Sequence, residues 1–224
     1  FKLINMKNNL LQYLPNQIKT EDVVNPLRIN NLNNIKESNG MILYIADREI
    51  RVYDNFSIQY GIQKSNELSY PFKIITPQPN INHPPKLEFI TEELKKIKKD
   101  FEKLNLDFEI VENVGKFLEK IKISLLIIDF NPIIKRNYLK NLDCHIVEID
   151  GHNIIPARYI SDKQEYNAAT FRRKVYNNIF PFFTEYKYPS NNTVIKNFIK
   201  NKLPYYNELK NNPLKDVTSG FSKY

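Results

Sequence analysis

The amino-acid sequence predicts an α/β fold, a Rossmann-like open sheet of five mostly parallel strands with helices on both faces. Five short runs rich in Ile, Leu and Val recur along the chain, and segments with helical periodicity lie between them. Each run is nearly continuous in apolar character, which is typical of strands that helices cover on both faces. Alternation of this kind predicts right-handed crossover connections. With 224 residues, 42% of them hydrophobic, the chain is large enough to bury a core.

The predicted strands are MILYIA (41–46), FKIIT (72–76), FEIVE (108–112), SLLIID (124–129) and HIVEI (145–149). The clearest helix is predicted from about Lys86 to Leu104, because its apolar residues recur at intervals of three and four. These residues are Leu87, Ile90, Leu94, Ile97, Phe101 and Leu104. Shorter helices are predicted over 55–68 and 115–121.

Outside the strand and helix alternation the chain divides into simpler segments. Residues 1–40 are Asn-rich and weakly periodic, which predicts an N-terminal extension ahead of an α/β domain at 41–175. Residues 176–204 contain prolines and clustered aromatic residues, which indicate a linker followed by a short helix. Residues 205–224 end in polar residues without a closing element, so we expect them to begin a second domain of a longer protein.

Composition excludes several classes of protein. The single cysteine, Cys144, excludes a disulfide framework, and only three histidines are present, so no metal site is expected. No apolar run approaches the roughly 20 residues of a membrane span, and the first residues contain no signal-peptide core. We therefore expect an intracellular protein, cytoplasmic or nuclear according to the host, with no membrane partner.

The positive charge is concentrated near the C-terminus. Residues 172–224 contain ten Lys and Arg against three Asp and Glu, which gives +7 of the formal net charge of +8. One interpretation is a solvated Lys-rich surface. The other is a segment that approaches nucleic-acid phosphates, where basic side chains gain affinity by releasing counterions.

The common catalytic motifs are missing. No G-x-G-x-x-G and no Walker pattern follows the first predicted strand, although backbone amides at strand ends could still bind a nucleotide. Cys144 and His145 are adjacent at the start of a predicted strand, so their side chains point to opposite faces and do not form a catalytic pair. Acidic neighbours such as Glu92 and Glu93 lie on the exposed side of the predicted helix.

The polar stretch 148–175 is different, because it follows the last predicted strand, where an α/β sheet presents its ligand-binding loops. It holds His, Asn, Ser, Asp, Lys, Gln, Glu, Tyr, Thr and three Arg. One interpretation is a functional loop. The other is a hydrogen-bonded crossover in which Ser161 is the N-cap of a helix.

This stretch resembles the motif that closes the N-terminal α/β domain of class II cyclobutane pyrimidine dimer photolyases, D-A-H-N-I-V-P followed by S-D-K-Q-E-Y-x-A-x-T-x-R. The matching residues are His152, Asn153, Ile154, Pro156, Ser161, Asp162, Lys163, Gln164, Glu165, Tyr166, Ala168, Thr170 and Arg172. Three further blocks are similar to the family in the same order: NPLRI (25–29), LYIADREIRVYDN (43–55) and IIDFNP (127–132). In the second block Phe56 follows at a position where the family usually has Trp.

The end of the chain resembles the entry to the family's helical flavin domain, over 206–224. By position, the resemblance implies contacts with the FAD phosphates for Tyr206, Thr218, Ser219, Gly220, Phe221 and Ser222. Hydroxyl groups and backbone amides in a tight turn can bind phosphate oxygens without a Gly-rich loop. Lys210 stands where the family has an arginine near DNA and flavin. No catalytic residue is implied within this chain.

The resemblance implies the N-terminal part of an enzyme, a DNA photolyase that repairs cyclobutane pyrimidine dimers in UV-damaged DNA by electron transfer from light-excited reduced FAD. We expect this stretch to be inactive alone. An antenna chromophore (a deazaflavin, flavin or folate) is also implied, although PPKLEFITEEL (84–94) lacks the arginine of the family's antenna-side helix.

Two alternatives stay open. The departures Phe56, Lys210, Asn212 and Lys223 favour a non-catalytic photolyase- or cryptochrome-like binding or sensor module. The basic segment 172–224 alone favours a generic nucleic-acid binder. The sequence leaves the oligomeric state open.

Overall fold

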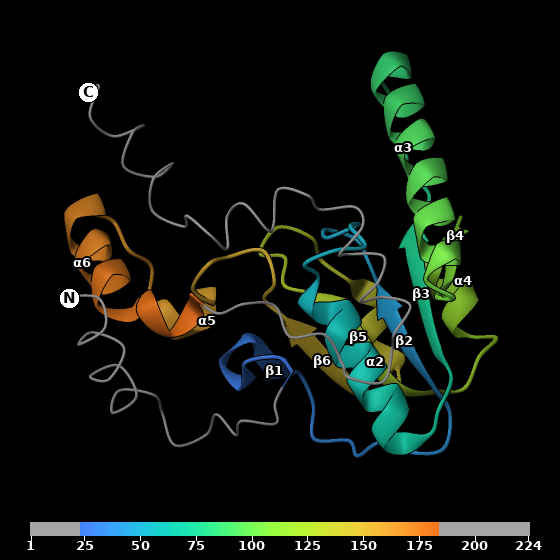
Figure 1. The fold of residues 1–224 in the computed structure, drawn as a ribbon, viewed down its shortest axis with the longest axis horizontal. Coiled ribbons are helices and arrows are strands. Elements are labelled where there is room, and N and C mark those ends of the chain that lie inside the picture. Colours follow the sequence, from blue (N-terminus) through green and yellow to red (C-terminus); the bar gives the residue numbers. More distant parts are fainter. Residues whose placement is uncertain (1–22, 184–224) are drawn as a thin grey trace. The chain divides into compact units, whose positions relative to one another are not determined.

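The computed structural model describes residues 23–183, which form an α/β unit around one sheet of six strands (Figure 1). The spatial order of the strands is β1-β6-β5-β2-β3-β4. Their bounds are β1 Ile29–Asn31, β2 Met41–Ile45, β3 Phe72–Pro77, β4 Asp107–Val111, β5 Ile123–Asp129 and β6 His145–Ile149. The α/β fold class and all five predicted strands are confirmed, each within one residue at either end.

The predicted strand count of five is wrong, because β1 adds a sixth strand inside the segment predicted to be an extension. This strand pairs antiparallel with β6, Ile29 opposite Ile149, whereas every other neighbouring pair in the sheet is parallel. Three residues, two of them asparagine, are too short and too polar to show strand periodicity. Main-chain pairing with β6 holds them at the edge of the sheet instead.

Three of the helices agree with the predicted segments 55–68, 86–104 and 115–121, and the other two lie in the stretch after β6, for which no helix bounds were predicted. The longer ones are α2 Phe56–Leu68, α3 Pro84–Lys103 and α6 Ala168–Asn178, and the shorter ones are α4 Val114–Leu118 and α5 Ala157–Ile160. Three 3-10 helices complete the elements of residues 23–183: η2 Pro26–Arg28, η3 Asn137–Asn141 and η4 Phe180–Phe182. Side chains of Asn55, His83 and Asn113 cap the N-termini of α2, α3 and α4 by accepting a backbone N–H.

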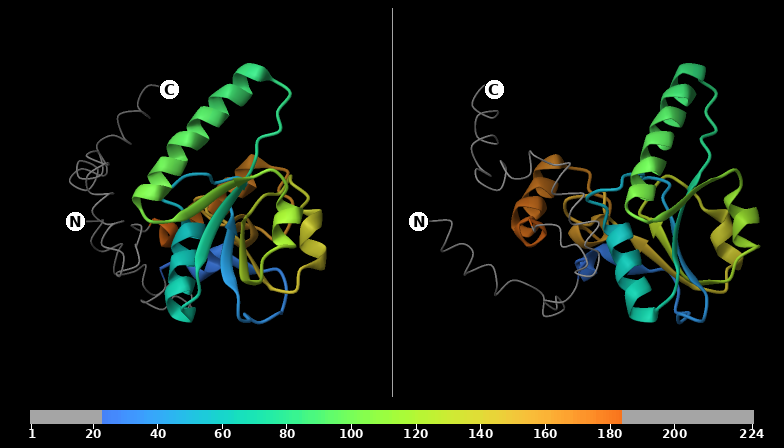
Figure 2. Two further views of the ribbon diagram at one scale, coloured as in Figure 1. Left: turned by 90° about the vertical axis from the view of Figure 1, so that its right-hand side faces the viewer. Right: turned by 45° about the vertical axis from the view of Figure 1, so that its right-hand side comes forward.

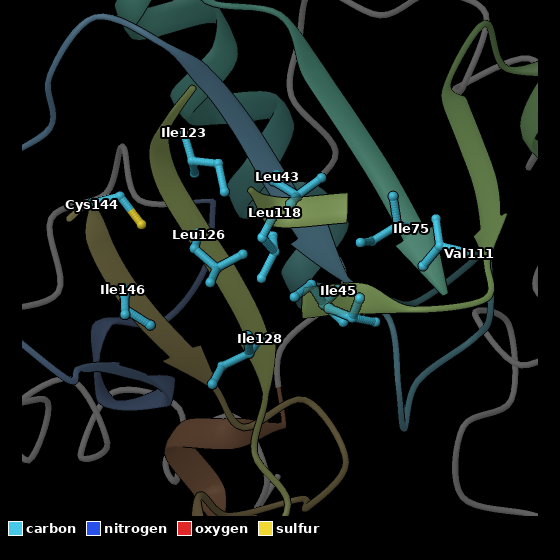
Figure 3. Packing of buried hydrophobic residues seen from close by; sticks show 11 residues of the cluster. Leu43, Ile45, Ile75, Val111, Leu118, Ile123, Leu126, Ile128, Cys144 and Ile146 are labelled. Atoms are coloured by element: carbon cyan, nitrogen blue, oxygen red, sulfur yellow. The ribbon is translucent and has the colours of Figure 1, made fainter. Parts of the chain in front are cut away.

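Both faces of the sheet are covered, as predicted. Helices α2 and α3 follow β2 and β3, and α4 and η3 lie on the opposite side of the sheet from α2 (Figure 2). On the α4 side, Leu43, Ile45, Leu126 and Ile128 form a buried apolar cluster with Leu118 of the helix (Figure 3). Tyr138 and Leu139 of η3 pack against the same cluster.

Only the second half of α3 packs on the sheet. Leu94, Phe101 and Leu104 are buried, whereas Leu87 and Ile90 are half-buried and Phe89 is 64% exposed. Figures 1 and 2 show the reason, since the first turns of α3 extend beyond the end of the sheet. The periodicity therefore predicted the helix correctly, but not how far its apolar stripe is covered.

Cys144 and His145 lie on opposite faces, as alternation predicted. Cys144 is buried in the cluster on the α4 side, and burial raises the pKa of its thiol to about 11. A thiol of that kind is a poor nucleophile at neutral pH. Among residues 23–183, no helix is both long and apolar enough to cross a membrane.

The chain reverses its direction of travel across the sheet between β2 and β5. From β2 the chain proceeds outward to β3 and β4, and from β5 it proceeds the other way to β6, while β2 and β5 are neighbours. In open α/β sheets the carboxyl ends of the two strands at such a switch point are the usual place for a site.

Candidate functional site at the carboxyl edge of the sheet

Three loops meet at the carboxyl edge of the sheet: 46–55 after β2, 130–136 after β5 and 150–167 after β6. Of the five buried charged residues among those the structure describes, Glu49 and Asp150 lie in these loops, and Asp129 and Glu148 lie near the ends of the strands that lead into them. The loop after β6 contains most of the motif that resembles the photolyase family, and the loops after β2 and β5 contain parts of two further similar blocks. The carboxyl edge is therefore the candidate site.

Asp129, the last residue of β5, fixes the loop after β2. Its carboxylate is fully buried and accepts hydrogen bonds from the Tyr44 hydroxyl (2.7 Å), from the backbone N–H groups of Arg48 (3.0 Å) and Glu49 (2.9 Å), and from Ser57. Burial raises the pKa of Asp129, and its hydrogen bonds oppose that rise. Burial, and next the Asp129 charge, raises the pKa of Tyr44 well above its ordinary value, so Tyr44 remains a donor.

A buried ion pair joins the loops after β2 and β5. The Arg136 guanidinium contacts the Asp47 carboxylate through Nε and Nη2, both at 2.7 Å, and Nη2 also donates to the Asp129 carbonyl at 2.8 Å. The two side chains are only 5% and 7% exposed. Although burial alone would lower the pKa of Arg136, the bond to Asp47 raises it. A bidentate pair of this geometry holds the two loops in one orientation.

Glu49 is a buried carboxyl group beside the loop 150–167, which is called the signature loop because it contains most of the photolyase-like motif. Its Oε2 lies 2.8 Å from Arg51, whose N–H groups are directed at the Asp54 carbonyl. Burial raises the pKa of Glu49 to about 7, with the Arg51 charge opposing and the Asp129 and Asp150 charges adding. Gly151 leaves the space that the carboxyl group occupies, because a Cβ there would lie 2.8 Å from Glu49 Oε2.

Glu49 is expected to make the protein less stable as pH rises. Its pKa is higher in the folded state than in the unfolded chain, so the folded state binds more protons between about pH 4.5 and 7. The free energy of unfolding should therefore fall by about 2–3 kcal/mol across that window relative to Glu49→Gln, which does not titrate. Urea unfolding at pH 4.5, 6 and 8 checks this, with Glu102→Gln on the exposed side of α3 as the matched control. Parallel pH profiles for wild type and Glu49→Gln would contradict it.

Arg28 links the NPLRI block to the signature loop. Its guanidinium is buried and donates to the carbonyls of Asp150 (2.8 Å), Asn153 (2.8 Å) and Ile154 (2.7 Å). Its Cζ lies 4.3 Å from the centre of the Phe56 ring, a cation–π contact. Phe56 thus supplies an aromatic face for Arg28.

Asp150, directly after β6, gives the signature loop its shape. The buried carboxylate accepts from the backbone N–H and the amide of Asn153 and from the backbone N–H of Ala157 at 2.7 Å. Asn153 is therefore a structural residue of the motif. Pro156 begins the next element as the N-cap residue of α5.

Ser161 is not the N-cap of a helix, contrary to one of the two predicted interpretations. It is the C-cap residue of α5, and its hydroxyl donates to Glu165 Oε1 at 2.7 Å, within a cluster completed by Lys174. The helix that follows begins at Ala168, with Asn167 as its N-cap. Serine and asparagine are both favoured at helix N-caps, so the sequence did not distinguish Ser161 from Asn167. A turn separates the two residues, and the helix begins after Asn167.

The remaining motif residues face solvent. His152, Asp162, Lys163, Gln164, Tyr166 and Arg172 are exposed. Tyr166 is 87% exposed and bonds only to the neighbouring Gln164, through its hydroxyl. Within residues 23–183, no hydrogen bond or ion pair involves the side chain of His152 or of Arg172. The motif therefore splits into a buried set that shapes the loop and an exposed set that is available to a partner.

The charged residues at the carboxyl edge of the sheet position the loops. The buried carboxylates and guanidinium groups bond to one another and to backbone, so the edge is a rigid frame. In the part of the chain that the structure describes, no group of three or more His, Cys, Asp or Glu is placed to hold a metal ion. The predicted FAD residues Tyr206, Thr218, Ser219, Gly220, Phe221 and Ser222, and the predicted DNA contact Lys210, lie outside the described residues.

Sequence reasoning missed the residues that build this frame. Asp129 and Asp150 could have been found, since each is an acid that directly ends an apolar strand. Arg136 gave no signal, because its partner Asp47 is 89 residues away. Glu49 was hidden in a charged loop whose burial the sequence does not show.

Comparison with known proteins adds homologues. No protein-family model matches the chain. A deoxyribodipyrimidine photo-lyase of Potorous tridactylus is 24% identical over 248 residues, which cover 85% of this chain and 46% of that protein. Another deoxyribodipyrimidine photo-lyase, of Arabidopsis thaliana, is 26% identical over 160 residues, which cover 63% of this chain and 32% of that protein. The chain thus spans less than half the length of these relatives, and it is a homologue of the N-terminal part of deoxyribodipyrimidine photo-lyases.

Proposed function

We propose that this chain supplies the α/β part of a class II DNA photolyase, which uses light and reduced FAD to reverse cyclobutane pyrimidine dimers in DNA. One observation supports the proposal most strongly. The stretch that resembles the photolyase motif leaves the carboxyl edge of a parallel sheet, in a chain homologous to photo-lyases.

The described residues act in this proposal as a scaffold. Arg28, Asp129, Asp150 and Arg136 hold the loops together through their hydrogen bonds. The flavin would supply the electron that opens the dimer. An antenna pigment (a deazaflavin, flavin or folate) follows from the resemblance alone.

The surface beyond the signature loop supports a contact with another protein unit. Half of the twelve exposed large hydrophobic side chains of the described residues lie between 159 and 183. They are Tyr159, Tyr166, Phe171, Tyr176, Phe180 and Phe183. Exposed apolar surface of this density marks interaction sites, and we propose that the flavin-binding part of the protein covers it.

The cofactor residues of the proposal lie at the end of the chain. Tyr206 and the turn Thr218–Ser222 would bind FAD phosphates through hydroxyl and backbone N–H groups. Backbone N–H groups in turns form anion-binding sites of this kind in other proteins. Lys210 would contact DNA near the flavin. A lysine keeps the charge of the family's arginine but loses its two-pronged hydrogen bonding.

The proposal is tested by light-dependent repair in the complete protein that contains this chain. Purified protein with reduced FAD and a dimer-containing oligonucleotide should restore intact pyrimidines under blue light and not in the dark. The 224-residue chain alone, in the same assay, should restore none. Absence of dimer reversal in the complete, flavin-loaded protein would overturn the proposed function. Dimer reversal by the 224-residue chain would contradict the expectation that this chain is inactive alone.

A second candidate is a non-catalytic photolyase- or cryptochrome-like module. The departures Lys210, Asn212 and Lys223 favour it, whereas Phe56 does not, because it keeps an aromatic contact with Arg28. The repair assay separates the two candidates. A complete protein that binds flavin and DNA but leaves dimers intact in the light would be such a module.

A further inference from the structure

A groove of about 340 Å³ lies between the first elements of the described chain and the start of the signature loop. Its walls come from η2, β1 and α5, and from Phe130 directly after β5. Glu148 of β6 also lines the groove. Sites for small molecules have volumes of about 300–1,000 Å³ and combine apolar walls with a few polar groups, so this groove is large enough to bind a ligand.

Glu148 contributes a carboxylate with one free oxygen. Its side chain is only 8% exposed, and its Oε2 accepts from Arg158 Nε at 2.9 Å and lies 3.5 Å from Asn30 Nδ2. Among residues 23–183, no donor is bonded to Oε1, and this oxygen is not completely covered. A ligand that donates one N–H to Oε1 would complete the hydrogen bonding of this nearly buried carboxylate.

Arg158 determines which oxygen of Glu148 stays free. Its Nε and Nη2 both lie 2.9 Å from Oε2 of Glu148. Its Cζ lies 5.5 Å from the centre of the Phe130 ring, a cation–π contact. The guanidinium is thus held by a carboxylate and an aromatic ring, although 58% of the side chain is exposed. Glu148 therefore presents Oε1 alone to a ligand.

Tyr159 of α5 gives the groove an aromatic wall. Its ring packs edge-on against Phe182, with ring centres 5.5 Å apart, and the Phe182 ring lies 5.4 Å from Cζ of Arg28. The Tyr159 side chain is still partly accessible, with 38% of the residue exposed. Leu27 and Pro156 add apolar surface to the same groove. A planar ring can stack on an aromatic side chain that is fixed in this way.

One acceptor oxygen beside an aromatic wall favours a planar ring that carries an amino group. The amino group of cytosine donates to carboxylates in this manner, and nucleobases stack on aromatic side chains. Uracil has a carbonyl oxygen where cytosine has the amino group. A carbonyl and a carboxylate are both acceptors, so uracil leaves Oε1 unpaired and repels it. The groove can therefore distinguish two bases of the same size.

We propose that this groove binds a nucleotide whose base carries an amino group, cytosine or adenine. The amino group donates to Glu148 Oε1, the ring stacks on Tyr159, and Arg158 is a positioning residue that holds Glu148. All of these contacts involve the base alone, so the nucleotide can be free or part of a single strand of DNA. The site requires neither flavin nor light.

Calorimetric titration of the 224-residue chain with deoxycytidine monophosphate and deoxyuridine monophosphate tests the proposal. The cytosine nucleotide should bind about tenfold more tightly, the factor expected for one hydrogen bond to a charged group. Short single strands of the same two deoxynucleotides distinguish the sources of the base. A cytosine preference in the monophosphates alone assigns the site to a free nucleotide, and a preference in the strands alone assigns it to DNA. Absence of a cytosine preference in both forms would overturn the proposal.

Glu148→Gln tests the contact with the amino group. Arg158 and Asn30 are both donors toward Oε2, so they keep the amide oxygen of the variant at that position and leave its N–H group in place of Oε1. The variant should therefore bind the uracil nucleotide more tightly than the cytosine nucleotide. An unchanged cytosine preference would contradict the proposal, because a merely structural role of Glu148 does not reverse the choice of base.

Tyr159→Ala tests the stacking contact at a partly exposed position. It should weaken the binding of both nucleotides about tenfold and leave the cytosine preference in place. The matched control for Glu148 is Glu102→Gln on the exposed side of α3, which should bind both nucleotides as the wild type does. Wild-type affinity in Tyr159→Ala would show that no base stacks in this groove.

Discussion

Replacing Arg28 by alanine should lower the free energy of unfolding by about 4 kcal/mol, because three backbone carbonyl groups, in one buried and two part-buried hydrogen bonds, lose one charged donor. The carbonyls belong to Asp150, Asn153 and Ile154, each within 2.8 Å of the guanidinium. The cation–π contact with Phe56 is lost as well. Urea unfolding of the 224-residue chain measures the change, and hydrogen exchange should show the largest loss of protection over 150–157.

Two variants delimit this prediction. Arg28→Lys should recover only part of the stability, because one ammonium group cannot reach three carbonyls at once. Arg173→Ala, which removes an exposed arginine from α6, should change the free energy by less than about 0.5 kcal/mol. A loss below about 1 kcal/mol in Arg28→Ala would show that the signature loop keeps its shape without the arginine.

Replacing Asp129 by alanine should cost a similar amount, about 4 kcal/mol, through the donors that it leaves unpaired. The backbone N–H groups of Arg48 and Glu49 and the Tyr44 hydroxyl all point at this carboxylate, in a site without access to solvent. Asp129→Asn should also be costly, since its amide turns an N–H toward groups that are themselves donors.

The exposed Asp143→Ala is the matched control for Asp129, and it should leave the unfolding midpoint nearly unchanged. Near-ultraviolet circular dichroism adds a second measurement, because Tyr44 should lose its fixed environment in Asp129→Ala. If both Asp129 variants unfold at the wild-type urea concentration, the carboxylate does not organise the loop after β2.

The core strands could be predicted from sequence because burial on both faces leaves a readable pattern. Ile42 to Ile45 and Leu125 to Ile128 are continuous apolar runs, and each is almost completely buried. Strand β1 could not be predicted, because an edge strand of three residues is specified by main-chain pairing with β6 and not by its own side chains.

The candidate site was predictable only in its location. The polar stretch after β6 marked the carboxyl edge, and the edge is where the buried charges gather. The roles within it depend on contacts between distant residues, such as Arg28 with a carbonyl 122 residues away. Backbone carbonyls leave no trace in a sequence, so the structural roles of Arg28, Asp150 and Asn153 could be found only in the fold.

The central claim is that this α/β unit belongs to a flavin-dependent photolyase, and flavin retention by the complete protein tests it most directly. The protein is purified without added flavin, and the bound cofactor is measured by absorption. We expect an equimolar amount of FAD, which falls sharply when Thr218 and Ser219 are both replaced by alanine and stays unchanged in the control Asp143→Ala, an exposed residue outside the proposed flavin site. A complete, folded protein that retains no FAD, and takes up none when it is supplied, would contradict the account.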